Sequence, residues 1–285
     1  MSGLPLPFSR GSSSRRRHHL HRRRHGSHRP PLFQTILLFV CAGFAFYVFY
    51  MLFSSVLLSS GNSSQDLLAQ GVSICRVYGR HGRLDYDGID VSRHQGSIDW
   101  TKVGSDSCVR FVYIKATEGG DLKDSFYLRN VRQARSAGIL VGSYHYFTSS
   151  SSVKEQFRNF YSLVDRRVQD LPPVIDVEDE ALRGLSTTTL RHRLFELASL
   201  MERHYHVQPI IYCYAGFYNR HLWPHFNHYR LFVSHYSAAE LPLAHGARPC
   251  IWQHSDRGII DGVGCSVDLD VLANGIALSD LRVVR

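Results

Sequence analysis

Short apolar runs alternate with longer amphipathic segments along residues 85–285. The short runs are rich in Val, Ile, Tyr and Phe, which is typical of β-strands, and they cover residues 88–92, 109–116, 139–147, 172–178, 209–215, 230–236, 249–255 and 266–272. Helical periodicity with suitable start and stop residues occurs at 124–138, 152–168 and 186–205. Strands separated by helices predict βαβ units and a mainly parallel sheet.

The number of predicted strands favours an α/β fold of the barrel type. Eight strands in about 200 residues correspond to an irregular TIM-like β/α barrel. The last three strands are close together, and residues 236–265 contain no clear helical pattern. We therefore expect the end of the domain to consist of strands joined by loops.

A different pattern precedes this domain. Residues 32–58 form an uncharged apolar stretch, and about 20 such residues in a helix span a bilayer. The apolar core of a cleaved signal peptide is shorter, roughly 7–15 residues. The stretch therefore predicts an uncleaved transmembrane signal anchor that contacts membrane lipid. Residues 59–84 are interpreted as a stalk or linker, and 85–285 as the catalytic domain.

The positive charge of the chain is concentrated before that stretch. Residues 1–31 contain eight arginines, five histidines and no acid, so the other residues hold 33 − 8 = 25 basic against 24 acidic side chains. Basic flanks stay in the cytoplasm, which predicts a single-pass inner-membrane protein whose N-terminus is inside and whose domain faces the cell wall. The tail could also bind nucleic acid, but membrane topology explains it more economically, and we expect no nucleic-acid partner.

The cysteines agree only loosely with an exported domain. Cys41 lies in the predicted span, and Cys75, Cys108, Cys213, Cys250 and Cys265 follow it. Disulfides are permitted outside the cytoplasm, yet five is an odd number, so at least one thiol is predicted to be free.

Most of the predicted strands end in polar or aromatic side chains. In an α/β barrel the site lies at the carboxyl ends of the strands. These ends carry Asp90, Lys115, Glu118, Tyr144, Tyr146, Asp176, Glu178, Tyr212, Tyr214, Trp252, Gln253 and Asp268. A single strand-end acid is ordinary, and aromatic residues commonly pack in a core. Acids at three separate strands, interleaved with aromatics, indicate a site.

Asp176 and Glu178 are the central pair of this pattern. Residues two apart on a strand leave by the same face, with β-carbons roughly 6.5–7 Å apart. Neighbouring carboxylates raise one another's pKa, and a carboxylic acid that stays protonated can protonate a glycosidic oxygen. Asp176 could instead be a helix cap or a strand-end hydrogen-bond acceptor. Asp179 and Glu180 are interpreted as solvated loop acids.

Several of these segments resemble a known family. The segments DGIDVSRHQGSIDW, FVYIKATEGGDLKDSFYLRNVRQARSAGILVGSYHYF, PPVIDVEDE, PIIYCYAGF and IWQHSDRGIIDGVGCSVDLDVL are similar to the family 25 glycoside hydrolases, the Chalaropsis-type lysozymes. The resemblance runs from about residue 86 to residue 273. It implies an irregular β/α barrel that cleaves the β-1,4 bond between N-acetylmuramic acid and N-acetylglucosamine in peptidoglycan.

The resemblance also implies roles for individual residues. Glu178 is expected to be the general acid, and Asp176 its nucleophile or the group that orients a substrate acetamido. Asp90 and Asp268 are expected to complete the acidic floor. The residues similar to sugar-contacting positions are Tyr144, Tyr212, Trp252 and Gln253. We expect a monomer that binds peptidoglycan glycan strands and needs no cofactor or metal.

Three alternatives stay open beside this interpretation. Retention, inversion and substrate-assisted cleavage are all compatible with the acid spacing, and net retention is our expectation. His221, His225 and His228 have spacings that suggest zinc, but Pro224 breaks the helix that would align them. A membrane-tethered peptidoglycan-binding module without turnover is the remaining alternative, and the intact set of acids argues against it.

Overall fold

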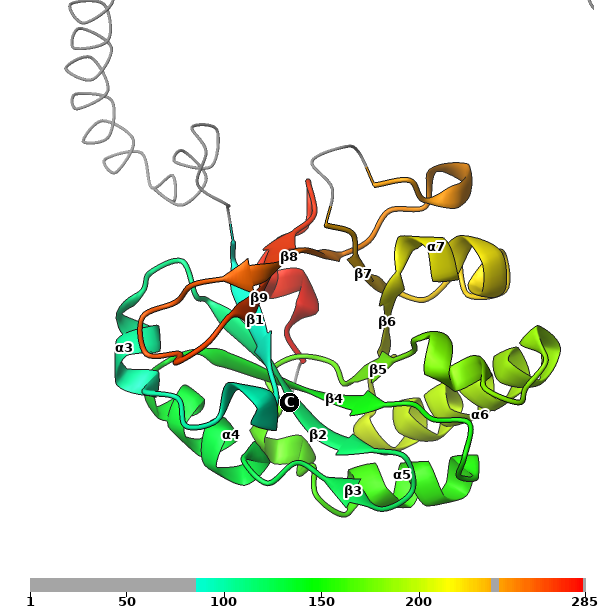
Figure 1. Cartoon of the computed structure of the whole chain (residues 1–285), viewed down its shortest axis with the longest axis horizontal. Helices are drawn as coiled ribbons and strands as arrows, with labels where there is room; N and C mark the ends of the chain where they lie inside the picture. Colours follow the sequence, from blue (N-terminus) through cyan, green and yellow to red (C-terminus); the bar gives the residue numbers. More distant parts are fainter. Residues whose placement is uncertain (1–85, 237–240, 284–285) are drawn as a thin grey trace, which may run out of the picture. The chain divides into compact units, whose positions relative to one another are not determined.

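A closed barrel of eight strands forms the centre of the domain (Figure 1). The structure is a computed structural model that describes residues 86–236 and 241–283. The barrel strands are β1 (Gly88–Val91), β2 (Phe111–Glu118), β4 (Leu140–Tyr146), β5 (Val174–Asp176), β6 (Ile210–Tyr214), β7 (Leu231–Ser234), β8 (Ile251–Gly258) and β9 (Val267–Leu272). Pairing of β1 with β2 closes the ring, and all eight predicted strands are confirmed.

One strand runs against the others. The pairs from β1 through β2 and β4 to β8 are parallel, whereas β9 is antiparallel to both β8 and β1. The loop 259–266 joins β8 directly to β9, and a direct hairpin reverses direction, whereas a parallel return needs a longer crossover. The expectation of an irregular barrel is confirmed, but the description as TIM-like is wrong. Sequence reasoning also missed β3 (Leu122–Lys123), which pairs with the end of β2.

Three helices cover one side of the barrel, and all three were predicted. They are α4 (Tyr127–Ser136), α5 (Val153–Tyr161) and α6 (Thr187–Tyr205). Ser152 and Glu155 form a capping box at the start of α5, and Ser186 caps α6. The predicted helix 152–168 is shorter than expected, since the chain leaves α5 after Tyr161 and turns again at Arg166–Val168.

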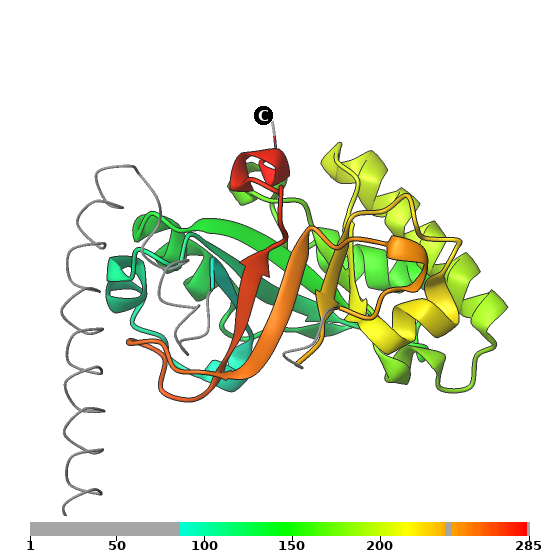
Figure 2. The ribbon, with the colours of Figure 1, turned by 90° about the horizontal axis from the view of Figure 1, so that it is seen from above.

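The remaining helical pieces are short. They are the single turns α3 (Trp100–Ser105), α7 (Ala215–Phe217), η2 (Arg93–Gln95), η4 (Asp179–Leu182), η5 (Tyr218–Leu222), η6 (Ala244–Gly246) and η7 (Leu278–Leu281). Within the described part of 236–265, η6 is the only helical turn, as the sequence predicted. Figures 1 and 2 both show the β8–β9 hairpin away from α6.

Two apolar cores result from strand alternation. The larger core lies between the outward face of the strands and the helices and includes Ile114, Val141 and Leu197. The smaller core fills the amino-terminal end of the barrel interior, where Phe111, Ile210 and Leu281 of η7 pack together. The interior is thus closed at that end, which leaves the carboxyl ends of the parallel strands for a site.

The predicted anchor and stalk lie outside the described residues, as do the boundaries 1–31, 32–58 and 59–84. No helix within 86–236 and 241–283 combines the length and apolar character needed to cross a bilayer. Cys213, Cys250 and Cys265 carry free thiols, while Cys108 is disulfide-bonded.

Candidate active site

A cavity of about 400 Å³ opens at the carboxyl ends of the parallel strands. Its walls come from β1, β2, β4, β5, β6, β7, β8 and β9, so segments far apart in the sequence meet there. The lining residues that the sequence singled out are Asp90, Lys115, Tyr144, Tyr146, Asp176, Glu178, Tyr212, Gln253 and Asp268. The four predicted acids therefore lie in one cavity.

Asp176 and Glu178 enter this cavity by the alternation that the sequence predicted. Val177, between them, is fully buried in the outer core, and its amide donates to the carbonyl of Tyr212 on β6. Extended pairing therefore continues past the end of β5 and carries Glu178 to the same face as Asp176. Asp176 is nearly buried, whereas Glu178 is partly exposed.

The two acids influence each other's protonation. Burial, and then the charge of Glu178, raise the pKa of Asp176 well above its usual range. The pKa of Glu178 is also raised, mainly by burial, while a hydrogen bond from Tyr146 and the charge of Lys115 oppose the rise. A carboxyl group that keeps its proton to higher pH is suited to general acid catalysis.

Asp90 and Asp268 form a second acidic pair across two strands. They are directly opposite in the β1–β9 register. Burial and the Asp268 charge raise the pKa of Asp90, and burial followed by the charge of Asp256 raises the pKa of Asp268 to about 6. The floor therefore holds more protons near neutral pH than four isolated carboxylates would.

Gln253 organises one wall of the cavity. Its Nε2 donates to Asp90 Oδ2 at 2.6 Å. Its Oε1 accepts hydrogen bonds from Tyr212 Oη at 2.8 Å and Tyr236 Oη at 2.7 Å. Gln253, which was predicted to contact sugar, thus makes three hydrogen bonds within the protein. These bonds fix Asp90 and the two tyrosine rings relative to each other.

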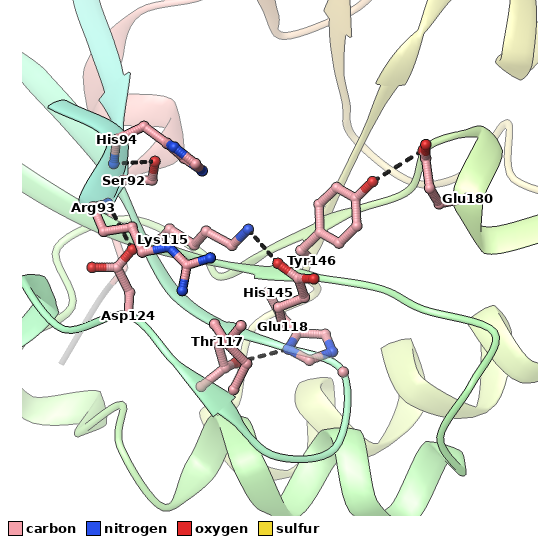
Figure 3. A network of polar contacts seen from close by, with 12 residues as sticks. Ser92, Arg93, His94, Lys115, Thr117, Glu118, Asp124, His145, Tyr146 and Glu180 are labelled. Carbon is pink, nitrogen blue, oxygen red and sulfur yellow. Dashed lines mark hydrogen bonds and ion pairs between the residues drawn. The ribbon is translucent and has the colours of Figure 1, made fainter.

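Lys115 is the only lysine or arginine among the described lining residues. Its Nζ forms an ion pair with Glu118 Oε2 at 2.7 Å and lies 4.7 Å from the centre of the Tyr146 ring. Figure 3 shows Lys115 extended toward Glu118 beside Tyr146. A single cation among four acids leaves the cavity acidic.

Hydrogen bonds hold the rim of the cavity in place (Figure 3). Ser92 and Gln95 form a capping box around η2, and the amide of Arg93 donates to Asp124 Oδ2 at 2.7 Å. Beneath Tyr146, the buried His145 ring contacts Thr117 Oγ1 at 2.8 Å. Burial lowers the pKa of His145 to about 4, so this ring is a neutral link between β2 and β4.

Trp252 is not among the residues that line the cavity, and its sugar contact stays a prediction. Because Gln253 faces the barrel interior, its neighbour Trp252 faces the opposite way, where its Nε1 donates to the carbonyl of His235. Sequence patterning located the strand but could not assign its faces, since polar Gln253 is the inward residue.

The places of Tyr236 and Asp270 were not predicted. Tyr236 lines the cavity two residues after the end of β7. It is the aromatic residue that ends the predicted strand 230–236, so its place at a strand end was an available signal. Asp270 lies two residues after Asp268 on the same face and is fully buried. Its carboxyl oxygens have no hydrogen-bond partner, and burial and the charge of Asp90 raise its pKa.

A second hollow lacks such chemistry. It has a volume of about 900 Å³ and lies between α3, α4 and the β8–β9 loop, and its single acid, Asp99, caps α3. His221 of the considered zinc set contacts Thr187 Oγ1 at 3.0 Å. Within the part of the chain that the structure describes, no three His, Cys, Asp or Glu side chains are grouped as metal ligands.

Paired carboxylates beside aromatic rings, at the carboxyl end of a β/α barrel, define a class of protein. That class is the glycoside hydrolases, which act through two carboxyl groups that flank the scissile bond. Residues 89–263 match the family model described as glycosyl hydrolases family 25. The chain belongs to this family and is a glycoside hydrolase.

Individual relatives agree with this assignment. The chain is 43% identical over 189 residues to the uncharacterized protein YegX of Escherichia coli K12, covering 65% of this chain and 68% of that one. It is 32% identical over 205 residues to lysozyme M1 of Streptomyces globisporus, covering 68% and 69%. The crystal structure of a bacterial lysozyme from Streptomyces coelicolor superimposes with a TM-score of 0.62 at 33% identity, covering 68% and 94%.

Proposed function

We propose that this chain is a lysozyme that cleaves the β-1,4 bond between N-acetylmuramic acid and N-acetylglucosamine in peptidoglycan. The observation that carries the proposal is the placement of Asp176 and Glu178 on one face at the end of β5, inside an acidic cavity. Tyr144, Tyr146 and Tyr212 line the same cavity, and aromatic faces suit the apolar faces of sugar rings. The lysozyme name of a relative supports the choice of substrate.

Each acid has a proposed part in the reaction. Glu178 gives its proton to the glycosidic oxygen as the bond to the anomeric carbon breaks. Asp176, in its ionised form, then attacks that carbon, or holds the substrate acetamido group so that it attacks instead. Water completes the hydrolysis and returns a proton to Glu178. Asp90 and Asp268 stabilise positive charge that develops on the sugar ring.

The setting of the enzyme is proposed from the sequence. Residues 32–58 would anchor the protein in the cytoplasmic membrane through lipid contacts, with the N-terminus inside and the barrel on the cell-wall side. A tethered monomer in that place suits turnover of the wall of the same cell. A non-catalytic peptidoglycan-binding module is the competing function.

Substitution of the proposed acid separates these functions. Glu178→Gln keeps the shape of the side chain but removes the proton, so release of reducing ends from peptidoglycan should fall by about 10²- to 10⁴-fold. Binding to insoluble peptidoglycan should remain. Trp252→Phe, at a position outside the cavity, is the matched control and should keep most activity. Full activity of Glu178→Gln would refute the acid assignment, and an inactive wild type would favour the binding module.

A further inference from the structure

One phenol hydroxyl lies between two carboxylates at the rim of the cavity. Tyr146 Oη is 3.3 Å from Glu178 Oε2 and 3.2 Å from Glu180 Oε2. Figure 3 shows the Tyr146 ring on β4 directed toward Glu180, which lies in η4. Glu180 is exposed, and the sequence alone indicated only a solvated loop acid.

A phenol has a single proton to donate. If Tyr146 donates to Glu180, the ionised form of Glu178 loses that hydrogen bond, so Glu178 keeps its proton to higher pH. If Tyr146 donates to Glu178, the hydrogen bond favours the ionised form of that acid. The two glutamates therefore compete for one donor, and the outcome decides whether Glu178 keeps a proton.

The other charged groups around Glu178 do not replace this contact. Lys115 on β2 faces it as a cation, and Asp176, Asp90 and Asp268 face it as acids from β5, β1 and β9. Asp179, in the same turn as Glu180, accepts a hydrogen bond from Tyr214 at 3.0 Å, and Arg220 donates to that tyrosine. Within residues 86–236 and 241–283, only Glu180 shares the Tyr146 hydroxyl with Glu178.

We propose that Tyr146 and Glu180 are positioning residues for the general acid. The Glu180 carboxylate competes for the Tyr146 hydroxyl, which weakens the hydrogen bond from that hydroxyl to ionised Glu178, and the negative charge of Glu180 favours a proton on Glu178. This inference rests on the proposed role of Glu178 in glycoside hydrolysis. It is supported by the pKa of Glu178, which the Glu180 charge raises and the Tyr146 hydrogen bond lowers.

Two substitutions should move the titration of Glu178 in opposite directions. Glu180→Gln removes the charge and frees the phenol for Glu178, so the pKa of Glu178 should fall. Tyr146→Phe removes the donor, so that pKa should rise. The measurement is a carbon-13 NMR titration of the full chain with glutamate labelled at its carboxyl carbon. Glu178→Gln assigns the signal, and unchanged signals of the other glutamates show that each variant is folded.

Matched controls separate sharing of the hydroxyl from charge alone. Glu202→Gln, on the exposed face of α6, removes one negative charge away from the cavity. It should leave the pKa of Glu178 unchanged. Asp179→Asn removes the neighbouring charge without touching Tyr146. It should lower the pKa of Glu178 less than Glu180→Gln does. Equal effects of these two variants, or a fall with Tyr146→Phe, would overturn the proposal.

Kinetic measurements then test whether the Tyr146 hydroxyl shared by Glu178 and Glu180 affects turnover. The basic limb of the kcat profile should move to lower pH by about half a pH unit in Glu180→Gln and to higher pH in Tyr146→Phe, with KM for peptidoglycan little changed. An unmoved limb in both variants would contradict the proposal. The NMR titration needs no substrate. Absence of lysozyme activity would therefore refute the proposed function, while the titration would still decide whether Tyr146 and Glu180 set the pKa of Glu178.

Discussion

At the scale of residues, the acids of the cavity differ by their surroundings rather than by their chemistry. Asp176 lies deep, and its Oδ1 has no hydrogen-bond partner, whereas Glu178 is nearer to solvent and contacts Tyr146. In the proposed mechanism the deeper acid meets the anomeric carbon, and the outer acid meets the leaving oxygen. A difference of one methylene and two positions along the chain thus separates the two proposed roles.

The sequence predicted the inward acids because period-two alternation is a local property. Asp176, Glu178 and Asp90 lie where alternation and strand-end position placed them. Asp268 reaches the cavity from the amino-terminal start of β9, because that strand is antiparallel. The sequence could not predict that Trp252 faces outward, nor that Glu180 reaches Tyr146, because both depend on pairing between strands. Gln253 was named for sugar contact, but its three hydrogen bonds within the protein are visible only in the fold.

Asp270 gives a prediction about stability. Its raised pKa means that the folded protein keeps this proton while the unfolded chain releases it, so stability is fully present below the unfolded pKa of about 3.9 and is lost as pH rises toward the folded pKa. Asp270→Asn mimics the protonated acid. The variant should have a higher Tm than the wild type at pH 7, with the difference shrinking toward pH 4. Thermal unfolding followed by circular dichroism at several pH values measures this.

The control for Asp270 is an acid at the surface. Asp261→Asn, whose partner Lys102 is also exposed, should change Tm little at either pH. A lower Tm of Asp270→Asn at pH 7 would show that Asp270 is ionised in the folded protein.

At the scale of elements, the strands, the long helices and the mainly parallel sheet were predictable, but the direction of β9 was not. The apolar runs and cap residues such as Ser152 and Ser186 are local signals. Alternation is the same for either direction, so nothing in residues 266–272 indicated that β9 is antiparallel. The two-residue strand β3 and the single turns α3 and α7 are too short to show a period.

Packing between β2 and β4 gives a prediction about Gly142. A β-carbon at this position would lie 2.2 Å from the ring of Tyr113, which fills the barrel below the cavity. Gly142→Ala should therefore lower the free energy of unfolding by about 1–3 kcal/mol. Denaturant unfolding measures the change. Gly264→Ala, at a glycine with open space around it, is the matched control and should be close to neutral.

At the scale of the whole molecule, the barrel has an apolar end and a polar end. Leu281 of η7 closes the former with Phe111 and Ile210, and the acids line the latter. One closed end supports the fold while the other is free for chemistry, which is the usual division of labour in α/β barrels. The reversed β9 keeps this arrangement, because Asp268 and Asp270 still alternate inward.

The proposed anchor gives a prediction for the full chain. If residues 32–58 span the bilayer, the protein should stay in the membrane fraction after alkaline carbonate washing, and deletion of 32–58 should release it. Replacing the arginines of 1–31 with alanine is the control, because those residues set orientation and not insertion. Extraction of the intact chain by carbonate would contradict a spanning segment.

The central claim is that the acidic cavity cleaves the muramic acid–glucosamine bond of peptidoglycan. Mass spectrometry of borohydride-reduced products, released by the purified full chain from intact peptidoglycan, tests it most directly. We predict that every new reducing end is N-acetylmuramic acid and that Glu178→Gln yields almost none. New ends of N-acetylglucosamine, or no products from the wild-type chain, would contradict the claim.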